Sequence, residues 1–161
     1  MNDTNKVRSA QFFFQEAYRA QNAKEFDTAV DLYKRSIEEH PTAEAHTFLG
    51  WTYSYMGKID DAIEECRRAI AVDPDFGNPY NDIGSYLMKK GKLEEAVYWL
   101  EKAKTAPRYE PRHYPYLNLG RIYLATGRFD EAQREFAQAR FIFETVVRPE
   151  RPSRKNSVEV N

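Results

Sequence analysis

The sequence predicts an all-α protein built as an array of about four helical hairpins. Two observations carry this prediction: a motif that returns at a nearly constant spacing, and a glycine that interrupts each helical stretch partway through the unit. The motif is an apolar residue followed by glycine, with an alanine twelve residues later; it occurs at Leu49-Gly50 with Ala62, at Ile83-Gly84 with Ala96, and at Leu119-Gly120 with Ala132. Units that start near Ala10, Ala43, Gly77 and His113 are therefore 33, 34 and 36 residues apart.

Within each unit, apolar residues at helical spacing come before and after a break at Gly57, Gly91 or Gly127. Glycine can end a helix in the left-handed conformation, and the acidic residues that follow it favour the start of the next helix. The small residues of the repeated motif let the two helix backbones approach closely. Each unit is thus a helical hairpin, and neighbouring hairpins must stack to bury their apolar faces.

Three of the four units depart from this pattern. The first unit has Ala17 in the glycine slot and Lys24 where the others have the turn glycine. The third unit ends in a longer link with two prolines, at 106–111. In the last unit we expect the second helix to run on to about Val147, before Pro149.

With these motifs in register, the chain resembles the tetratricopeptide repeat (TPR) family from about Ala10 to Val147. The resemblance implies a right-handed superhelical array of about four hairpins. We expect a flexible N-terminus at 1–9, repeats at about 10–42, 43–76, 77–112 and 113–147, and a disordered basic tail at 148–161.

The resemblance also implies a binding site, because the first helix of each TPR hairpin lines a concave groove. Carried over by position, the residues expected to face a ligand are Phe14, Tyr18, Phe48, Trp51, Tyr55, Asn78, Asn81, Asp82, Lys89, Tyr114, Asn118 and Arg121. Aromatic side chains are common anchors of protein interfaces, and asparagine can pair with a peptide backbone. Tyr18, Trp51 and Tyr55 are the expected anchors, whereas Phe48 fits a core position equally well.

Some members of the family bind the C-terminal carboxylate of heat-shock chaperones through a clamp of lysines, asparagines and an arginine or lysine. Aligned over the first three units, the clamp positions hold Phe14, Tyr18, Phe48, Asn78 and Asp82; over the last three they hold Thr47, Trp51, Asp82, Tyr114 and Asn118. Neither set contains a cation, and an aspartate would repel a carboxylate. We expect no chaperone-tail binding of this kind.

Composition narrows the remaining classes of function. The 24 basic and 25 acidic side chains nearly cancel, which argues against nucleic-acid binding despite Arg112 and Tyr114 near Arg121. The single cysteine, Cys66, fits a reducing compartment and a buried packing role, and we expect a cytoplasmic protein without a membrane span. The scattered histidines and paired carboxylates form no catalytic or metal pattern, so we expect neither an enzyme nor a cofactor.

The last unit raises an alternative function. No polar capping helix follows it, so Phe141, Phe143 and Val147 are expected to form an apolar edge. This edge could pair with a second copy in a homodimer or fold onto its own hairpin. The sequence thus predicts a scaffold or adaptor that binds a protein or peptide, with self-association, or a regulatory role in an enzyme or nucleic-acid complex, as alternatives.

Overall fold

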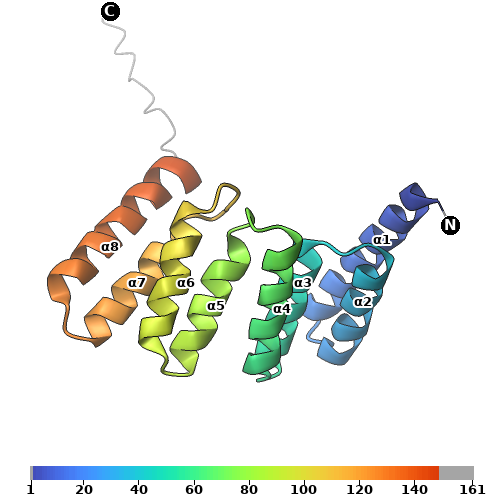
Figure 1. Cartoon of the computed structure of the whole chain (residues 1–161), viewed down its shortest axis with the longest axis horizontal. Coiled ribbons are helices and arrows are strands. Elements are labelled where there is room, and N and C mark those ends of the chain that lie inside the picture. Colours follow the sequence, from blue (N-terminus) through green and yellow to red (C-terminus); the bar gives the residue numbers. More distant parts are fainter. Residues whose placement is uncertain (1, 149–161) are drawn as a thin grey trace, which may run out of the picture. The chain divides into compact units, whose positions relative to one another are not determined.

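The computed structural model describes residues 2–148, and in this part of the chain it contains eight α-helices and one short π-helix (Figure 1). The helices are α1 (Asp3–Asn22), α2 (Phe26–Glu39), α3 (Ala43–Tyr55), α4 (Ile59–Val72), α5 (Asn78–Lys89), α6 (Leu93–Thr105), α7 (Tyr114–Ala125) and α8 (Phe129–Ile142), followed by η1 (Phe143–Val147). Consecutive helices pack in pairs as four hairpins, α1 with α2, α3 with α4, α5 with α6 and α7 with α8. The all-α hairpin fold expected from the sequence is confirmed.

The turn between the two helices of each hairpin is built around one residue with a positive φ. Gly57, Gly91 and Gly127 have φ values of 77°, 74° and 75°. Lys24 takes the same left-handed conformation in the first hairpin, with a φ of 61°. The first hairpin therefore keeps the turn of the others with a residue whose Cβ disfavours that conformation.

The first helix starts well before the boundary drawn from the sequence. Residues 1–9 were expected to be flexible, but α1 begins at Asp3. The side chain of Asn2 accepts a hydrogen bond from the backbone N–H of Thr4, and Asp3 lies in the first turn. These N-terminal polar groups cap the helix and favour its positive end, which explains the additional turns.

The chain divides into two compact units, one up to Glu110 and one from Pro111. Unit 1 holds the first three hairpins and unit 2 holds the fourth hairpin with η1. In unit 1, α2 packs against α3 and α4 packs against α5, while α1 also touches α3 and α3 touches α5. The first helices of the three hairpins of unit 1 therefore lie next to one another.

The core of unit 1 is made of small residues between helices and larger residues between hairpins. Ala17, Ala29, Tyr33 and Leu49 belong to one buried cluster across the first two hairpins. At Gly84 the opposing helix leaves no room for a side chain, because an added Cβ would lie 2.5 Å from Cγ of Leu100. The expectation that the repeated glycine permits close helix packing is met there.

The long link after α6 folds back onto the preceding link of unit 1. Gly77 donates a backbone hydrogen bond to Arg108 at 2.8 Å, and Arg108 donates one to Asp75 at 3.0 Å. Tyr109 is buried, and an added Cβ on Gly77 would lie 2.5 Å from its Cβ. The extra residues of the third repeat thus form a packed strap rather than a loose linker.

Unit 2 ends in a change of helix type. The last hairpin helix was expected to continue to about Val147; the backbone does so, but with α-helical geometry only to Ile142 and a π-helix from Phe143 to Val147. Of the tail expected to be disordered, 149–161 lie outside the described residues.

Candidate protein-binding site

The candidate site is the surface of unit 1 formed by α1, α3 and α5, which we call the first-helix face. The predicted site residues on these helices are Phe14 and Tyr18 on α1, Phe48, Trp51 and Tyr55 on α3, and Asn78, Asn81, Asp82 and Lys89 on α5. Because contacts join α1 to α3 and α3 to α5, these positions belong to one continuous stretch of unit 1.

Four predicted residues form a chain of aromatic contacts from α1 to α3. The ring centroid of Phe48 lies 5.2 Å from that of Phe14, 5.7 Å from that of Tyr18 and 4.6 Å from that of Trp51. Phe48 also lies 6.2 Å from the buried Tyr33 of α2. Aromatic rings at these separations attract one another beyond their burial. Phe48 therefore serves both possibilities left open by the sequence, since it packs on the core and supports the surface rings.

Two predicted anchors present much of their rings to solvent. Tyr18 is 45% exposed and Tyr55 is 63% exposed. Tyr55 stacks on Phe26 at the start of α2, with centroids 5.7 Å apart and 20° between the ring planes. The stack holds Tyr55 in place, so little further side-chain entropy is lost on binding, which suits an anchor.

Trp51 is joined to the third hairpin through Asp82. The indole Nε1 of Trp51 donates a hydrogen bond to Oδ2 of Asp82 at 2.5 Å. Asp82 also accepts a side-chain hydrogen bond from Asn81. Burial raises the pKa of Asp82 to about 7, and these two hydrogen bonds oppose that rise. The sequence analysis did not anticipate this link, because Trp51 and Asp82 are far apart in the chain.

Two of the predicted polar residues of α5 already form hydrogen bonds within unit 1. Asn81 is buried beside Asp82, and Asn78 donates a hydrogen bond from its side-chain nitrogen to the carbonyl of Glu110 at 3.2 Å. Asn81 thus already bonds Asp82 and exposes little surface, and its contact with a ligand stays a prediction. Lys89 is exposed, with its Nζ 5.8 Å from the centroid of Tyr86.

A hollow of about 610 Å³ extends the first-helix face toward the start of α1. It is lined by Val7, Ala10, Gln11, Phe14, Gln15, Ser36, His40, Thr42 and Glu44. Phe14 therefore borders both this hollow and the aromatic chain. An open, partly apolar hollow next to exposed rings is suited to a side chain of a protein ligand.

The predicted residues of unit 2 form a smaller group on α7. Tyr114 and Arg121 are exposed, and Nη1 of Arg121 donates to Oδ1 of Asn118 at 3.1 Å. Asn118 is buried, and its contact with a ligand stays a prediction. Of this group, the exposed tyrosine and arginine remain candidates.

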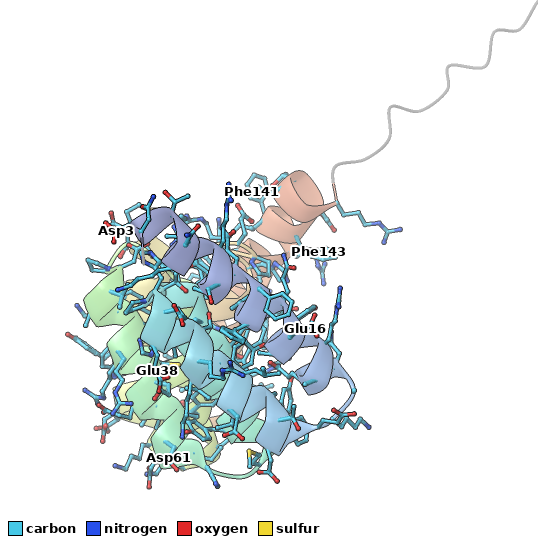
Figure 2. The ribbon with its side chains drawn as sticks, turned by 90° about the vertical axis from the view of Figure 1, so that its right-hand side faces the viewer. Asp3, Glu16, Glu38, Asp61, Phe141 and Phe143 are labelled. Atoms are coloured by element: carbon cyan, nitrogen blue, oxygen red, sulfur yellow. The ribbon has the colours of Figure 1, made fainter. Side chains whose placement is uncertain are left out.

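The predicted edge at the end of unit 2 is only partly uncovered. Figure 2 shows Phe141 and Phe143 at the C-terminal end of the helical part; Phe141 is 60% exposed. Phe143 is less exposed because its ring lies 5.2 Å from that of His113. Ile142 is buried, whereas the side chain of Val147 lies outside the described part of the structure. Ile142 and Phe143 thus pack on their own hairpin, and pairing of this edge with a second copy stays a prediction.

The sequence analysis did not anticipate a buried polar network in the second hairpin, and it gave Cys66 only a packing role. Nδ1 of His46 lies 2.7 Å from Oε2 of the buried Glu65, whose Oε1 accepts from Arg68 at 2.6 Å. This network joins α3 to α4 inside the second hairpin. Cys66 is fully buried, as expected, and burial is the main reason that its thiol pKa is raised well above its usual value. A thiol held in its protonated form is a poor nucleophile.

Within residues 2–148, no cluster of three or more His, Cys, Asp or Glu side chains is arranged to hold a metal ion. In the same part of the chain, none of the helices combines the length and apolar composition that crossing a bilayer requires.

Comparison with family models gives tetratricopeptide repeats at residues 43–76, 78–108 and 114–139. The small glutamine-rich tetratricopeptide repeat-containing protein 2 of Mycosarcoma maydis is 31% identical over 51% of the chain, which spans 24% of that protein. The photosystem I assembly protein Ycf3 from a strain of Prochlorococcus marinus is 27% identical over 76% of the chain and 79% of that protein.

Solved structures share the fold at low sequence identity. PilF of Pseudomonas aeruginosa has a TM-score of 0.79 and 22% identity over 86% of this chain and 63% of that chain. The second TPR domain of Spaghetti (RPAP3), bound to the HSP90 peptide SRMEEVD, has a TM-score of 0.60 and 21% identity over 65% of this chain and 96% of that chain. With its repeats matched over more than half its length, the chain belongs to the tetratricopeptide repeat family.

Proposed function

We propose that the protein is a non-catalytic scaffold or adaptor whose first-helix face in unit 1 binds a peptide or helix of a partner protein. The observation that carries this proposal is the exposure of Tyr18 and Tyr55, the first held against Phe48 in the aromatic chain and the second stacked on Phe26. Exposed rings whose orientation is fixed by neighbouring rings lose little freedom on binding. We place this function in the cytoplasm, where a lone cysteine such as Cys66 stays reduced.

Relatives of the chain support a protein ligand rather than a small molecule. The RPAP3 TPR domains have been solved with a chaperone peptide, and Ycf3 is named as an assembly protein. The ligand of this chain differs in our proposal, because the first-helix face carries Asp82 instead of the cations of a carboxylate clamp. The partner is a protein segment that does not depend on a terminal carboxylate.

A pull-down with a matched control tests the proposal. The test variant combines Tyr18→Ala and Tyr55→Ala, and the control combines Phe12→Ala and Tyr98→Ala, which are 59% and 57% exposed on α1 and α6 and lie outside the predicted groove positions. All four rings are large and exposed, so both variants should stay folded by circular dichroism. Partners retained by the control and lost by the test variant support the proposal. Equal retention by both variants contradicts it.

A second candidate function rests on a separate observation in unit 2. Phe141 and Val146 are exposed on α8 and η1. An uncovered apolar edge of this kind suits pairing with a second copy of the chain. Light scattering of wild type and of Phe141→Ser with Val146→Ser distinguishes this role: a dimer in wild type alone favours it, and a monomer at high concentration excludes it.

A further inference from the structure

The aromatic chain of Phe14, Tyr18, Phe48 and Trp51 in unit 1, which we call the aromatic row, ends at the carboxylate of Asp82. Asp82 accepts hydrogen bonds from Trp51 and Asn81, but it forms no salt bridge within residues 2–148. The Asp82 residue as a whole is half-buried, beside the partly buried Trp51. When it is ionised, this carboxylate places a negative charge beside the indole of Trp51.

Other acidic groups of unit 1 that take part in its packing are paired. Asp73 and Glu44 both bond the guanidinium of Arg108, at 2.5 Å and 2.8 Å. Glu65 is paired with Arg68 at 2.6 Å. Asp82 differs from these groups in having neutral hydrogen-bond donors only.

The charge of Asp82 acts on its surroundings. After burial, the charge of Asp82 is the next cause that raises the pKa of the Cys66 thiol and of the Tyr86 hydroxyl. Both groups release a proton less readily when the neighbouring Asp82 is ionised. Lys89 lies over the Tyr86 ring and is not among the groups that lower the pKa of Asp82.

A cation brought by a ligand would find two favourable partners here. A partly desolvated carboxylate attracts an ammonium or guanidinium group more strongly than one fully in water, because the local dielectric constant is lower. The rings of the row add cation–π attraction, which is largest for tryptophan. A ligand carboxylate at the same place would be repelled.

We propose that the first-helix face of unit 1 selects peptide segments that carry a lysine or arginine, whose cation binds Asp82 beside Trp51, together with an apolar residue for the aromatic row. This inference rests on the proposed peptide-binding function and adds the charge of its ligand. It assigns to Asp82 the role of a specificity determinant and to Tyr18 and Tyr55 the role of anchors.

Selection from a displayed library of random 12-residue peptides tests both the proposed peptide binding and the inferred preference for a basic residue. The baits are the whole chain as wild type, Asp82→Asn, Asp61→Asn and the Tyr18→Ala with Tyr55→Ala variant. The amide introduced by Asp82→Asn keeps an oxygen that can accept the Trp51 hydrogen bond, and Asp61→Asn removes the same charge from an exposed site at the start of α4. Each bait is checked by circular dichroism before selection.

Wild type and Asp61→Asn should enrich peptides with Lys or Arg at a fixed distance from an apolar residue, and Asp82→Asn should enrich peptides with the apolar residue alone. For one selected peptide, replacing its lysine by norleucine should weaken binding to wild type about tenfold and leave binding to Asp82→Asn unchanged within about twofold. These results support the inference.

The contrary results separate the two proposals. Peptides enriched by wild type without a basic preference, and lost in the Tyr18 and Tyr55 variant, overturn the inference on charge while leaving groove binding intact. Enrichment of acidic peptides overturns it as well. No enrichment by wild type overturns the peptide-binding function and the inference with it.

Discussion

The second and third hairpins have the same helix–turn–helix arrangement, but their side chains differ at one matched position and in what faces the repeated glycine. Phe48 of the second hairpin and Asp82 of the third occupy the same place in the repeat, yet Phe48 packs among four rings whereas Asp82 holds a partly buried carboxylate. The glycine slots differ too: Gly50 faces the small Cys66, and Gly84 faces Leu100. The repeat dictates where helices run, while the side chains at each position determine local stability and ligand chemistry.

The largest expected effect is on the pH dependence of stability, which should change when the carboxyl group of Asp82 is removed. Its pKa is about 7 in the folded protein, against 3.8 for an ordinary aspartate. Between these values the folded chain binds a proton that the unfolded chain does not, so stability falls as pH rises from about 4 to 7 and is level above that. Asp82→Asn removes this loss. We expect the free energy of unfolding of Asp82→Asn minus that of wild type to be about 3 kcal/mol larger at pH 8 than at pH 4, so that the variant gains relative stability as pH rises.

Urea unfolding at a series of pH values measures this difference. Cys66 and Tyr86 do not titrate in this range because burial raises the pKa of both groups. The control is Asp61→Asn, whose free energy of unfolding should not show this gain over wild type as pH rises. Parallel curves for wild type and Asp82→Asn would show that Asp82 is ionised throughout.

Substitutions in the glycine slots should change stability by a smaller amount, and the substitution at Gly50 serves as the control for that at Gly84. A Cβ at position 84 would lie 2.5 Å from Cγ of the buried Leu100, which cannot move aside without shifting the α5–α6 packing. A Cβ at position 50 would meet the carbonyl oxygen of Ala62 at 3.1 Å and Sγ of Cys66 at 3.5 Å. We expect Gly84→Ala to destabilise the protein by about 2 kcal/mol and Gly50→Ala by less than about 1 kcal/mol, since alanine also favours the helix.

Thermal and urea unfolding of the two variants side by side measure this ordering. The first hairpin indicates that the slot can adapt, because Ala17 stands there naturally and is fully buried. Equal destabilisation by the two substitutions would mean that the backbone, rather than the opposing side chain, limits the space.

The fold was predictable from the sequence because its determinants are local and repeated. Turn glycines such as Gly57, and the small residues of the repeated motif, report directly on backbone conformation and helix spacing. The boundaries at Ala43, Gly77 and His113 lie within one residue of the start of a helix. The early start of α1 was missed because Asn2 and Asp3 form a cap that stands outside the repeat pattern.

The site was less predictable because its contacts join residues of different repeats. Position in the repeat brought Tyr18, Phe48 and Trp51 together correctly, since aromatic rings on adjacent first helices must meet. It did not predict that Asn81 is buried or that Trp51 bonds Asp82, because both depend on side-chain rotation and on which groups the next helix presents. One available signal was the pairing of a tryptophan and an aspartate at facing positions of consecutive repeats.

The smallest expected effect extends the comparison to the first hairpin, which has Lys24 where its neighbours have glycine. Its φ of 61° is close to the 77° of Gly57, so glycine fits this turn without rearrangement. The left-handed conformation is sterically unfavourable for a non-glycine residue, and the larger freedom of unfolded glycine only partly offsets the gain from removing the Cβ. We expect Lys24→Gly to stabilise the protein by about 0.5 kcal/mol, measured as a higher urea midpoint at constant slope. The control Lys58→Gly, at the N-cap of α4 with a negative φ, should give no gain. A loss of stability in Lys24→Gly would mean that the lysine side chain stabilises the turn by more than its backbone conformation destabilises it.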